Sequence, residues 1–304
     1  MTKEKPGVKR HVHRWYFTVD CGVERLKRPR KIGPYRILYR LGKGGSSEVY
    51  AAVGPWPQRV ALKVQRVPRK RKRFLQELDI LNRFHYTGLN HTLAFGIDSH
   101  GWCYLLMPLI DGRSATSYSQ SIHHAERERA VLKVAVELSE ILSHLHERDW
   151  IHGDVKSKNI LIDREGNAHL IDYELARPIT KTGRGKFFGT RSYAPPEQHA
   201  GDTLTSSADI YALACVICRM LSGSLPFPKD TAVEERQHHL NLPTGISDTL
   251  QNLLLRALSP DPDHRPDDGE DFAMDLRDIL GEPRGKEKSS TLVYSDLADS
   301  LKAK

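Results

Sequence analysis

The pattern of apolar residues changes at about residue 111, and this change restricts the fold more than any other feature of the chain. Between residues 35 and 66, branched and aromatic residues alternate with polar ones between glycines, as is typical of short antiparallel strands. One helical pattern comes next, at 71–85. From 125 to 149, and over most of the chain beyond 149, apolar residues recur at helical spacing. A strand-rich first part and a helical second part predict an α+β fold.

Bulk properties are those of an ordinary globular protein. The 304 residues are enough for two modest lobes around a real core, and 39% of them are hydrophobic. No apolar run approaches the roughly 18 residues needed to cross a bilayer, and the first residues lack the apolar stretch of a secretory signal. Four cysteines do not suggest a disulfide framework, so we expect a reduced, cytoplasmic protein.

Two of the cysteines, Cys215 and Cys218, form a Cys-X-X-Cys pair. The pair lies within an apolar helical pattern, and no second pair of metal ligands is visible. We therefore predict that both thiols belong to a buried helix rather than to a zinc site.

The positive charge is concentrated at the N-terminus. Residues 1–34 contain ten Lys or Arg against three Asp or Glu, a net charge of +7 within a total of +8. Such an extension is either a solvated leader or a surface that docks a partner or an anionic membrane surface, and we predict no specific nucleic-acid partner. Residues 13–20 alternate apolar and polar side chains and are compatible with one more strand.

A glycine-rich turn joins the first two predicted strands. It reads LGKGGSS and comprises Leu41, Gly42, Lys43, Gly44, Gly45, Ser46 and Ser47. Glycines allow the backbone to approach phosphates closely and to direct its N–H groups at them, although a simple hairpin turn also explains such a cluster. Ser47 stands where a third glycine of a phosphate-binding loop is expected.

Lys63 is a lone cation in the next predicted strand. Because an unpaired buried ammonium costs several kcal/mol, it should have a partner. Glu77 is the predicted partner, because it lies on the apolar-facing side of the helix 71–85. The alternative is that Glu77 is a solvated helix charge.

Four polar residues come after the long helix in an order that suits phosphoryl transfer. Asp154, Lys156 and Asn159 lie on one loop, and Asp172 follows a short apolar segment. Transfer needs positioning, metal charge and a group that orients the nucleophile or accepts its proton, and Asp154 suits this last role. Asn159 and Asp172 offer hard oxygen ligands for Mg²⁺, and Lys156 can balance charge on the moving phosphoryl group.

Together these residues resemble a protein kinase of the eukaryotic-like Ser/Thr class, a type also found in bacteria. The resemblance extends from Tyr35 to Leu280. It implies a bilobal fold with a small antiparallel-sheet N-lobe and a larger helical C-lobe. The implied divisions are a basic extension, the N-lobe, the C-lobe and a polar tail, at residues 1–33, 34–109, 110–281 and 282–304.

The resemblance also implies an activity and a set of site residues. The chain would transfer the γ-phosphoryl of ATP, with Mg²⁺, to Ser or Thr hydroxyls of protein substrates. Lys63 and Glu77 match the phosphate anchor and its helix partner, Asp154 the catalytic base, and Asn159 and Asp172 the metal ligands. The glycine-rich turn would cover the nucleotide phosphates, and the adenine would lie against Val49, Ala61, Leu161, the gatekeeper Met107 and the hinge residue Leu109. Pro108 departs from the usual acidic hinge residue.

Two other functions remain alternatives. Gly153 and Glu174 also resemble aminoglycoside and choline phosphotransferases, which share this plan. Features that favour a protein kinase are Lys156, the segment 189–198, Asp209 as a brace of the catalytic loop, and Arg265 as a partner of Glu197. A nucleotide-binding pseudokinase scaffold is the second alternative, favoured by Ser47, Gly153 and the Asp-Tyr-Glu triplet but opposed by the complete charged set.

Gly153 replaces the arginine that usually precedes the catalytic aspartate and pairs with a phosphate on the activation loop. We therefore expect a non-RD kinase that does not need phosphorylation of this loop. The loop carries many basic residues and no acid between 177 and 191, so it could bind a phosphate on Thr180 or Thr182 or attract an acidic substrate. The resemblance to the kinase family implies instead that Thr190 contacts Asp154 and Lys156 and favours Ser or Thr acceptors.

Overall fold

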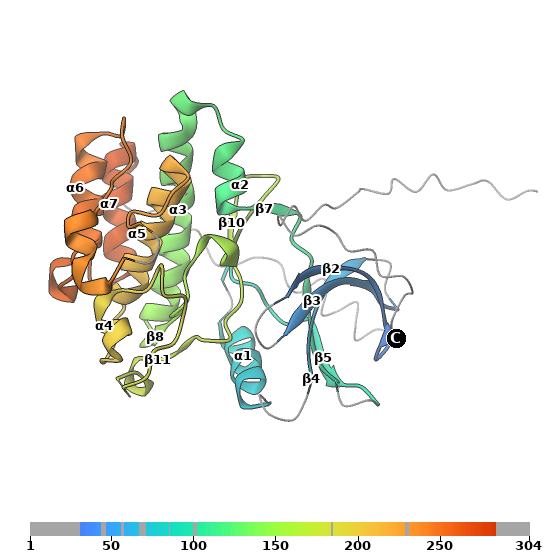
Figure 1. Cartoon of the computed structure of the whole chain (residues 1–304). Helices are drawn as coiled ribbons and strands as arrows, with labels where there is room; N and C mark the ends of the chain where they lie inside the picture. The colour runs from blue at the N-terminus through green and yellow to red at the C-terminus, as the bar shows by residue number, and fades with distance from the viewer. Residues whose placement is uncertain are drawn as a thin grey trace, which may run out of the picture.

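The computed structural model describes residues 31–43, 47–55, 58–66, 71–84, 86–99, 102–183, 185–228 and 231–283. It has two lobes, a sheet lobe and a helical lobe, so the predicted α+β, bilobal fold is confirmed. Figure 1 shows the sheet at the right, α3, α5, α6 and α7 gathered at the left, and α1 beside the sheet on the side that is turned toward these helices. The predicted strand at 13–20 and the tail after 283 lie outside the described residues.

The sheet lobe contains a six-stranded antiparallel sheet of order β1-β2-β3-β4-β6-β5. Three strands and the helix α1 (Arg71–Arg83) coincide with the alternating and helical patterns in the sequence, and β6 coincides with the apolar run at 101–110, which also predicts a strand. β1 and the edge strand β5 were not predicted, because each is too short to show a period. The strands are β1 (Lys31–Ile32), β2 (Tyr35–Lys43), β3 (Glu48–Val53), β4 (Arg59–Arg66), β5 (Ala94–Ile97) and β6 (Trp102–Pro108).

The two faces of this sheet belong to different apolar clusters. Directly opposed residues in antiparallel strands point to the same face, and the register pairs Val49 with Lys63 and Ala61 with Met107. This face joins the core that continues into the helical lobe. The other face, with Tyr50 and Leu62, forms a separate cluster. Lys63 therefore projects from the face that is turned toward the helical lobe.

The helical lobe is built around α3 (His124–His146) and α5 (Ser207–Ser222). α3 buries the predicted apolar positions Leu132, Val136 and Leu145. α5 is buried along nearly its whole length and ends at Gly223, which adopts φ 83°, a left-handed conformation that favours glycine. The other helices are α2 (Ala115–Gln120), α4 (Pro196–Ala200), α6 (Asp248–Ala257) and α7 (Gly269–Leu280).

Short strands place the loops that carry the predicted site. One sheet joins β7 (Gly112–Ser114), β9 (Ile160–Asp163) and β10 (Ala168–Leu170), and a two-stranded pair joins β8 (Trp150–Ile151) to β11 (Arg177–Pro178). These strands hold residues 152–159 and 171–176 side by side. The sequence pattern, which predicts helices for most of this region, does not reveal them, since strands of two to four residues are too short to show a period.

Cys215 and Cys218 lie fully buried in α5, as predicted. Burial raises the pKa of both thiols, which keeps them protonated and inert. None of the helices that the structure describes is both long and apolar enough to span a bilayer.

Candidate active site

The Lys63 ammonium bridges two carboxylates across the cleft between the lobes. Its Nζ lies 2.6 Å from Oε1 of Glu77 and 2.7 Å from Oδ1 of Asp172. The contact with Glu77, on α1, confirms the predicted partner. The contact with Asp172 links residues far apart in the sequence and was not predicted as an ion pair. Lys63 and Glu77 are almost fully buried, whereas the Asp172 side chain keeps 41% of its surface exposed.

The environment of this triad shifts the pKa of each member. Burial alone would lower the pKa of Lys63, but the attraction of Glu77 and Asp172 raises it overall. Burial raises the pKa of Glu77 to about 7 against the attraction of Lys63. Burial would also raise the pKa of Asp172, yet Lys63 lowers it overall. The ammonium thus remains charged beside an ionised Asp172.

The backbone at Asp172 adopts an unusual conformation. Its φ is 68°, in the left-handed region that a non-glycine residue rarely occupies. The following Tyr173 is buried, and its hydroxyl donates to the carbonyl of Leu170 at 2.7 Å. Gln76 of α1 donates to the carbonyl of Ala176 at 2.6 Å. The start of the segment that follows Asp172 is therefore fixed to both lobes.

Asp154 is the centre of a second polar cluster, on the loop between β8 and β9. Its Oδ2 accepts from Lys156 Nζ at 2.5 Å, and its Oδ1 accepts from the Thr190 hydroxyl at 2.7 Å. Lys156 also donates to Thr190 Oγ1 at 3.0 Å. These are the contacts predicted for Thr190.

Asn159 connects the two clusters. Its side-chain nitrogen donates to the Asp154 carbonyl at 3.0 Å, which leaves the amide oxygen free of that bond. Its carbonyl accepts from the Ile171 amide at 2.8 Å, next to Asp172. Lys63, Asp154, Asn159 and Asp172 therefore converge on one cleft. An amide oxygen and an exposed carboxylate are the oxygen ligands that Mg²⁺ prefers, so the residues fit a Mg²⁺ ion.

The described residues do not form a complete metal site by themselves. The described part of the chain contains no cluster of three or more His, Cys, Asp or Glu side chains that could hold a metal by itself. Two ligands alone suit an ion that arrives with nucleotide phosphates, because Mg²⁺ commonly completes its coordination with phosphate oxygens and water.

The catalytic loop is braced by Asp209 at the start of α5. This buried carboxylate accepts from the amides of His152 at 2.7 Å and Gly153 at 2.9 Å, and from His146 at 3.1 Å. Burial alone would raise the pKa of Asp209, but the bonds from His146 and from Gly153 lower it overall. The predicted brace is confirmed. His146, which also accepts from the Gly269 amide, was not identified from the sequence.

Several of the residues predicted to surround a nucleotide lie on the face of the sheet that carries Lys63. Leu41, Gly42 and Lys43 end β2, and Val49, Ala61 and Met107 lie on β3, β4 and β6. Leu109 follows β6 and is partly buried, and Leu161 of β9 is fully buried. Gly44, Gly45 and Ser46 lie outside the described residues, and Ser47 immediately precedes β3.

The activation segment, which we define as Asp172–Gln198, is held against the catalytic loop at Gly153. Gly153 has φ 71°, and a Cβ atom there would lie 2.8 Å from the Phe188 ring. The Arg177 guanidinium stacks on that ring at 3.6 Å from its centroid. Gln198 donates to the carbonyls of Gly153 at 3.0 Å and Phe188 at 2.6 Å. An aromatic ring thus occupies the space beside the residue that replaces arginine.

The two threonines proposed as phosphate carriers differ in exposure. Thr182 is buried, and its hydroxyl donates to the Ile179 carbonyl at 2.7 Å and accepts from the Leu204 amide at 2.9 Å. Thr180 is exposed. In this conformation only Thr180 presents a hydroxyl to solvent.

The far end of the activation segment is anchored by the predicted ion pair between Glu197 and Arg265. Two guanidinium nitrogens lie 2.7 and 2.9 Å from the two carboxylate oxygens. This bidentate geometry is the strongest form of such a pair, and the Arg265 side chain is fully buried.

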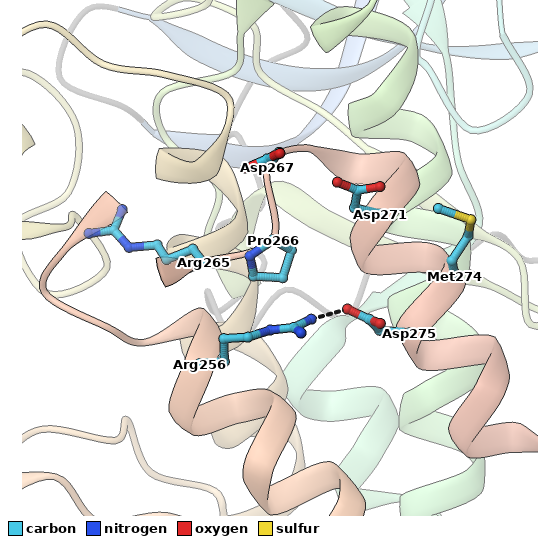
Figure 2. Close-up of a pocket in the computed structure, with 7 residues that line it drawn as sticks. All are labelled: Arg256, Arg265, Pro266, Asp267, Asp271, Met274 and Asp275. Atoms are coloured by element: carbon cyan, nitrogen blue, oxygen red, sulfur yellow. Dashed lines mark hydrogen bonds and ion pairs between the residues drawn. The ribbon is translucent and has the colours of Figure 1, made fainter. Parts of the chain in front are cut away.

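A hollow of about 300 Å³ lies between α6 and α7, next to Arg265, and none of the residues of the Lys63 and Asp154 clusters lines it (Figure 2). Asp267, Asp271 and Asp275 line it, and Arg256 bonds to Asp275. Asp268 caps α7, and acids in the first turn of a helix complement its dipole. The helix dipole and the ion pair with Arg256 therefore account for two of the three lining carboxylates, Asp271 and Asp275.

A sheet lobe with a buried Lys–Glu pair, and a helical lobe with an Asp–Lys–Asn loop and a second Asp that contacts the same lysine, form the arrangement expected of a phosphotransferase. Comparison with family models makes this specific: the protein kinase domain model matches residues 35–275. The chain belongs to the protein kinase family.

The similar curated proteins are bacterial serine/threonine-protein kinases, which confirms the predicted resemblance. The chain is 28% identical to PrkC of Bacillus subtilis over 86% of its length and 42% of that protein. It is 31% identical to PknH of Mycobacterium tuberculosis, over 83% of this chain and 42% of the relative. It is 30% identical to PknA of Corynebacterium glutamicum, over 88% of this chain and 61% of the relative. The chain spans about half the length of these relatives.

Proposed function

We propose that the protein is a serine/threonine protein kinase that transfers the γ-phosphoryl group of ATP to hydroxyls of protein substrates. The observation that carries this proposal is the contact of Thr190 with both Asp154 and Lys156, in the same cleft as the Lys63–Asp172 pair. The activation segment contacts Asp154 through Thr190, and this suits a peptide acceptor, because a peptide that lies along the segment would bring its hydroxyl to Asp154. The serine/threonine kinases among the similar proteins support the same activity.

Each polar residue has a role that its geometry supports. Lys63, fixed by Glu77, anchors the nucleotide phosphates as a fully charged donor. Asp154 orients the acceptor hydroxyl and takes its proton, and Lys156 balances the charge of the moving phosphoryl group. Asn159 and Asp172 would hold Mg²⁺, which when bound supplies positive charge at the phosphates.

The nucleotide would lie between the lobes. The glycine-rich turn, from Leu41 to Ser47, would cover the phosphates. The adenine would pack against Val49, Ala61, Met107 and Leu161, and the hinge backbone at Leu109 would hydrogen-bond to it. Apolar walls with a few backbone partners are typical of such pockets. The lobe boundaries at 34–109 and 110–281, the basic extension 1–33 and the tail 282–304 stay part of this proposal.

We infer that the kinase is of the non-RD type and does not need phosphorylation of the activation segment. The Phe188 ring, stacked by Arg177, packs where a side chain at Gly153 would lie. Gln198 ties the segment to the catalytic loop through two carbonyls. These contacts order the activation segment, which is the role of an arginine–phosphate pair in kinases that are activated by phosphorylation of this segment.

The substrates are proposed to be proteins with acidic residues near the acceptor hydroxyl. Lys181, Lys186 and Arg191 are exposed on the activation segment. Within the described part of the chain, none of the three has a carboxylate at ion-pair distance. Free positive charge beside the acceptor position favours a negatively charged substrate.

The alternative functions make different demands on the same site. A small-molecule phosphotransferase needs no peptide-binding segment, whereas here the Glu197–Arg265 pair and Thr190 hold one in place. A pseudokinase scaffold does not need its charged residues to lie together, whereas here Lys63 contacts Glu77 and Asp172, and Lys156 contacts Asp154. Both alternatives are therefore disfavoured.

The test is transfer of labelled γ-phosphate from ATP and Mg²⁺ to the enzyme itself, to generic acceptor proteins and to peptides, with Asp154→Asn as control. Label on serine or threonine that disappears in the variant would establish the activity. Bound nucleotide without transfer would contradict it, and a panel of aminoalcohol and sugar acceptors would then separate a small-molecule kinase from a pseudokinase.

A further inference from the structure

Arg236 is a buried cation that no sequence motif singled out. It lies in the short turn Val233–His239 after α5 and is 6% exposed. Its Nη1 donates to the carbonyl of Ala194 at 2.7 Å, and its Nη2 donates to the carbonyl of Arg191 at 2.8 Å. In the described structure, no carboxylate lies at ion-pair distance from it. Its charge is therefore held by carbonyl oxygens rather than by an acid.

Burying a guanidinium in this way is costly, so its neighbours matter. The guanidinium carbon lies 5.3 Å from the centre of the Phe227 ring, and Nη1 lies 3.5 Å from the Tyr211 hydroxyl. Its Nε has no hydrogen-bond partner among the described residues. The side chain is thus packed beside the Phe227 ring, and its two shortest hydrogen bonds are those that its terminal nitrogens donate to the carbonyls of Arg191 and Ala194.

Residues 190–194 form a turn that begins at the catalytic cluster. The amides of Tyr193 and Ala194 donate to the Thr190 carbonyl at 2.9 and 3.2 Å. The Thr190 hydroxyl donates to Asp154. The two carbonyls that Arg236 holds therefore belong to the same turn whose first residue contacts the catalytic aspartate.

We propose that Arg236 is a positioning residue for the phosphoacceptor: it fixes the 190–194 turn, and through Thr190 the surface on which the acceptor hydroxyl meets Asp154. The proposal rests on the proposed kinase function. The planar fork of an arginine can reach two carbonyls at once, whereas a lysine ammonium is a single point donor on a flexible stem. Small displacements of an acceptor reduce transfer strongly. None of the hydrogen bonds of Arg236 reaches Lys63, Glu77 or Asp172, which are proposed to serve the nucleotide.

The test compares Arg236→Ala and Arg236→Lys with wild type for transfer to a peptide acceptor and for binding of ATP. We expect kcat/KM for the peptide to fall by roughly tenfold to a hundredfold in both variants. The dissociation constant for ATP should stay within about twofold. Methylguanidinium added to Arg236→Ala should restore part of the loss. Arg256→Ala, which removes an exposed arginine between α6 and α7, is the matched control and should behave as wild type.

Amide hydrogen exchange provides a readout that does not depend on activity. The amides of Tyr193 and Ala194 should exchange faster in both Arg236 variants, while those of α6 and α7 stay unchanged. Equal loss of peptide transfer and ATP binding, wild-type kinetics in Arg236→Lys, or unchanged exchange at Tyr193 would each overturn the proposal. Wild-type enzyme that transfers nothing would instead contradict the kinase function, and the exchange result would still decide whether Arg236 fixes the turn.

Discussion

The catalytic loop and the activation segment are neighbours held by different chemistry. The catalytic loop is fixed by a buried carboxylate of another element, since Asp209 of α5 accepts two backbone amides and His146. The middle of the activation segment is fixed mostly by its own side chains, since Gln198 donates to the carbonyl of Phe188 and Arg177 stacks on the Phe188 ring, and Arg236 donates to the carbonyl of Arg191. The first arrangement depends on an ionised carboxylate and therefore on pH, whereas the second relies on an amide and on arginines, which stay charged at any ordinary pH.

This difference explains how the segment can be ordered without a phosphate. A phosphate pairs with cations, and Gly153 removes one of them. The contacts of Phe188 and Gln198 need no added charge. Four predictions test this comparison, from the largest expected effect to the smallest.

Asp154→Asn should nearly abolish transfer, because the acceptor hydroxyl loses the group that orients it and takes its proton. We expect kcat to fall by roughly 10²- to 10⁴-fold with ATP binding retained. Steady-state transfer and nucleotide titration measure the two quantities. Asp275→Asn, on the far side of the helical lobe, is the control and should leave both unchanged.

Asp209→Asn should destabilise the protein by about 2 kcal/mol at pH 7, because an amide cannot accept from all three donors of a buried carboxylate. The folded-state pKa of Asp209 is lowered, so its contribution is present above the unfolded pKa of about 4 and is lost as pH falls below it. Urea unfolding of both proteins at a series of pH values measures this. A difference in stability that grows toward acid pH would refute the assignment.

Phe188→Ala should lower kcat/KM for a peptide by about five- to tenfold, because Arg177 loses its stacking surface and the segment loosens over Gly153. The melting temperature should change little, since Phe188 is only partly buried. Phe95→Ala, which removes an exposed ring from the edge strand β5, is the matched control. Equal kinetics for the two variants would show that Phe188 has no part in ordering the segment.

Thr180→Ala should have the smallest effect, with activity within about twofold of wild type, because the exposed hydroxyl contacts nothing that the account requires. Thr182→Ala should lower stability by about 1 kcal/mol instead, because the Leu204 amide loses its acceptor. Transfer assays and thermal unfolding separate the two. Loss of activity in Thr180→Ala would contradict this prediction and would indicate that the kinase needs phosphorylation of Thr180.

Much of the fold and the cleft could be predicted because each feature has a local pattern. The strands 35–66 and the helix α3 show clear periods, and Lys63 needed a buried partner that the apolar-facing Glu77 supplies. The contact of Asp154 with Thr190 was expected from the resemblance to the kinase family. The burial of the Cys-X-X-Cys pair could be predicted from the apolar helix that contains it.

Most of the missed features are contacts between residues that lie far apart in the sequence. Arg236 and Gln198 bind carbonyl oxygens, which every residue possesses, so no residue type at the other end reveals them. The Lys63–Asp172 pair depends on the lobes closing on each other, and the position of Phe188 depends on the absence of a side chain at Gly153. Thr182 differs from Thr180 only through its position relative to Leu204, which the sequence pattern does not contain.

The most direct test of the central claim is the initial rate of phosphoryl transfer by wild-type enzyme treated with phosphatase and verified by intact mass to carry no phosphate. We predict transfer to an acceptor peptide from the first turnover, without a lag and at the rate of the untreated enzyme. A lag that ends when phosphate appears on the activation segment would contradict the account, because the segment would then need the charge that Phe188 and Gln198 are proposed to replace.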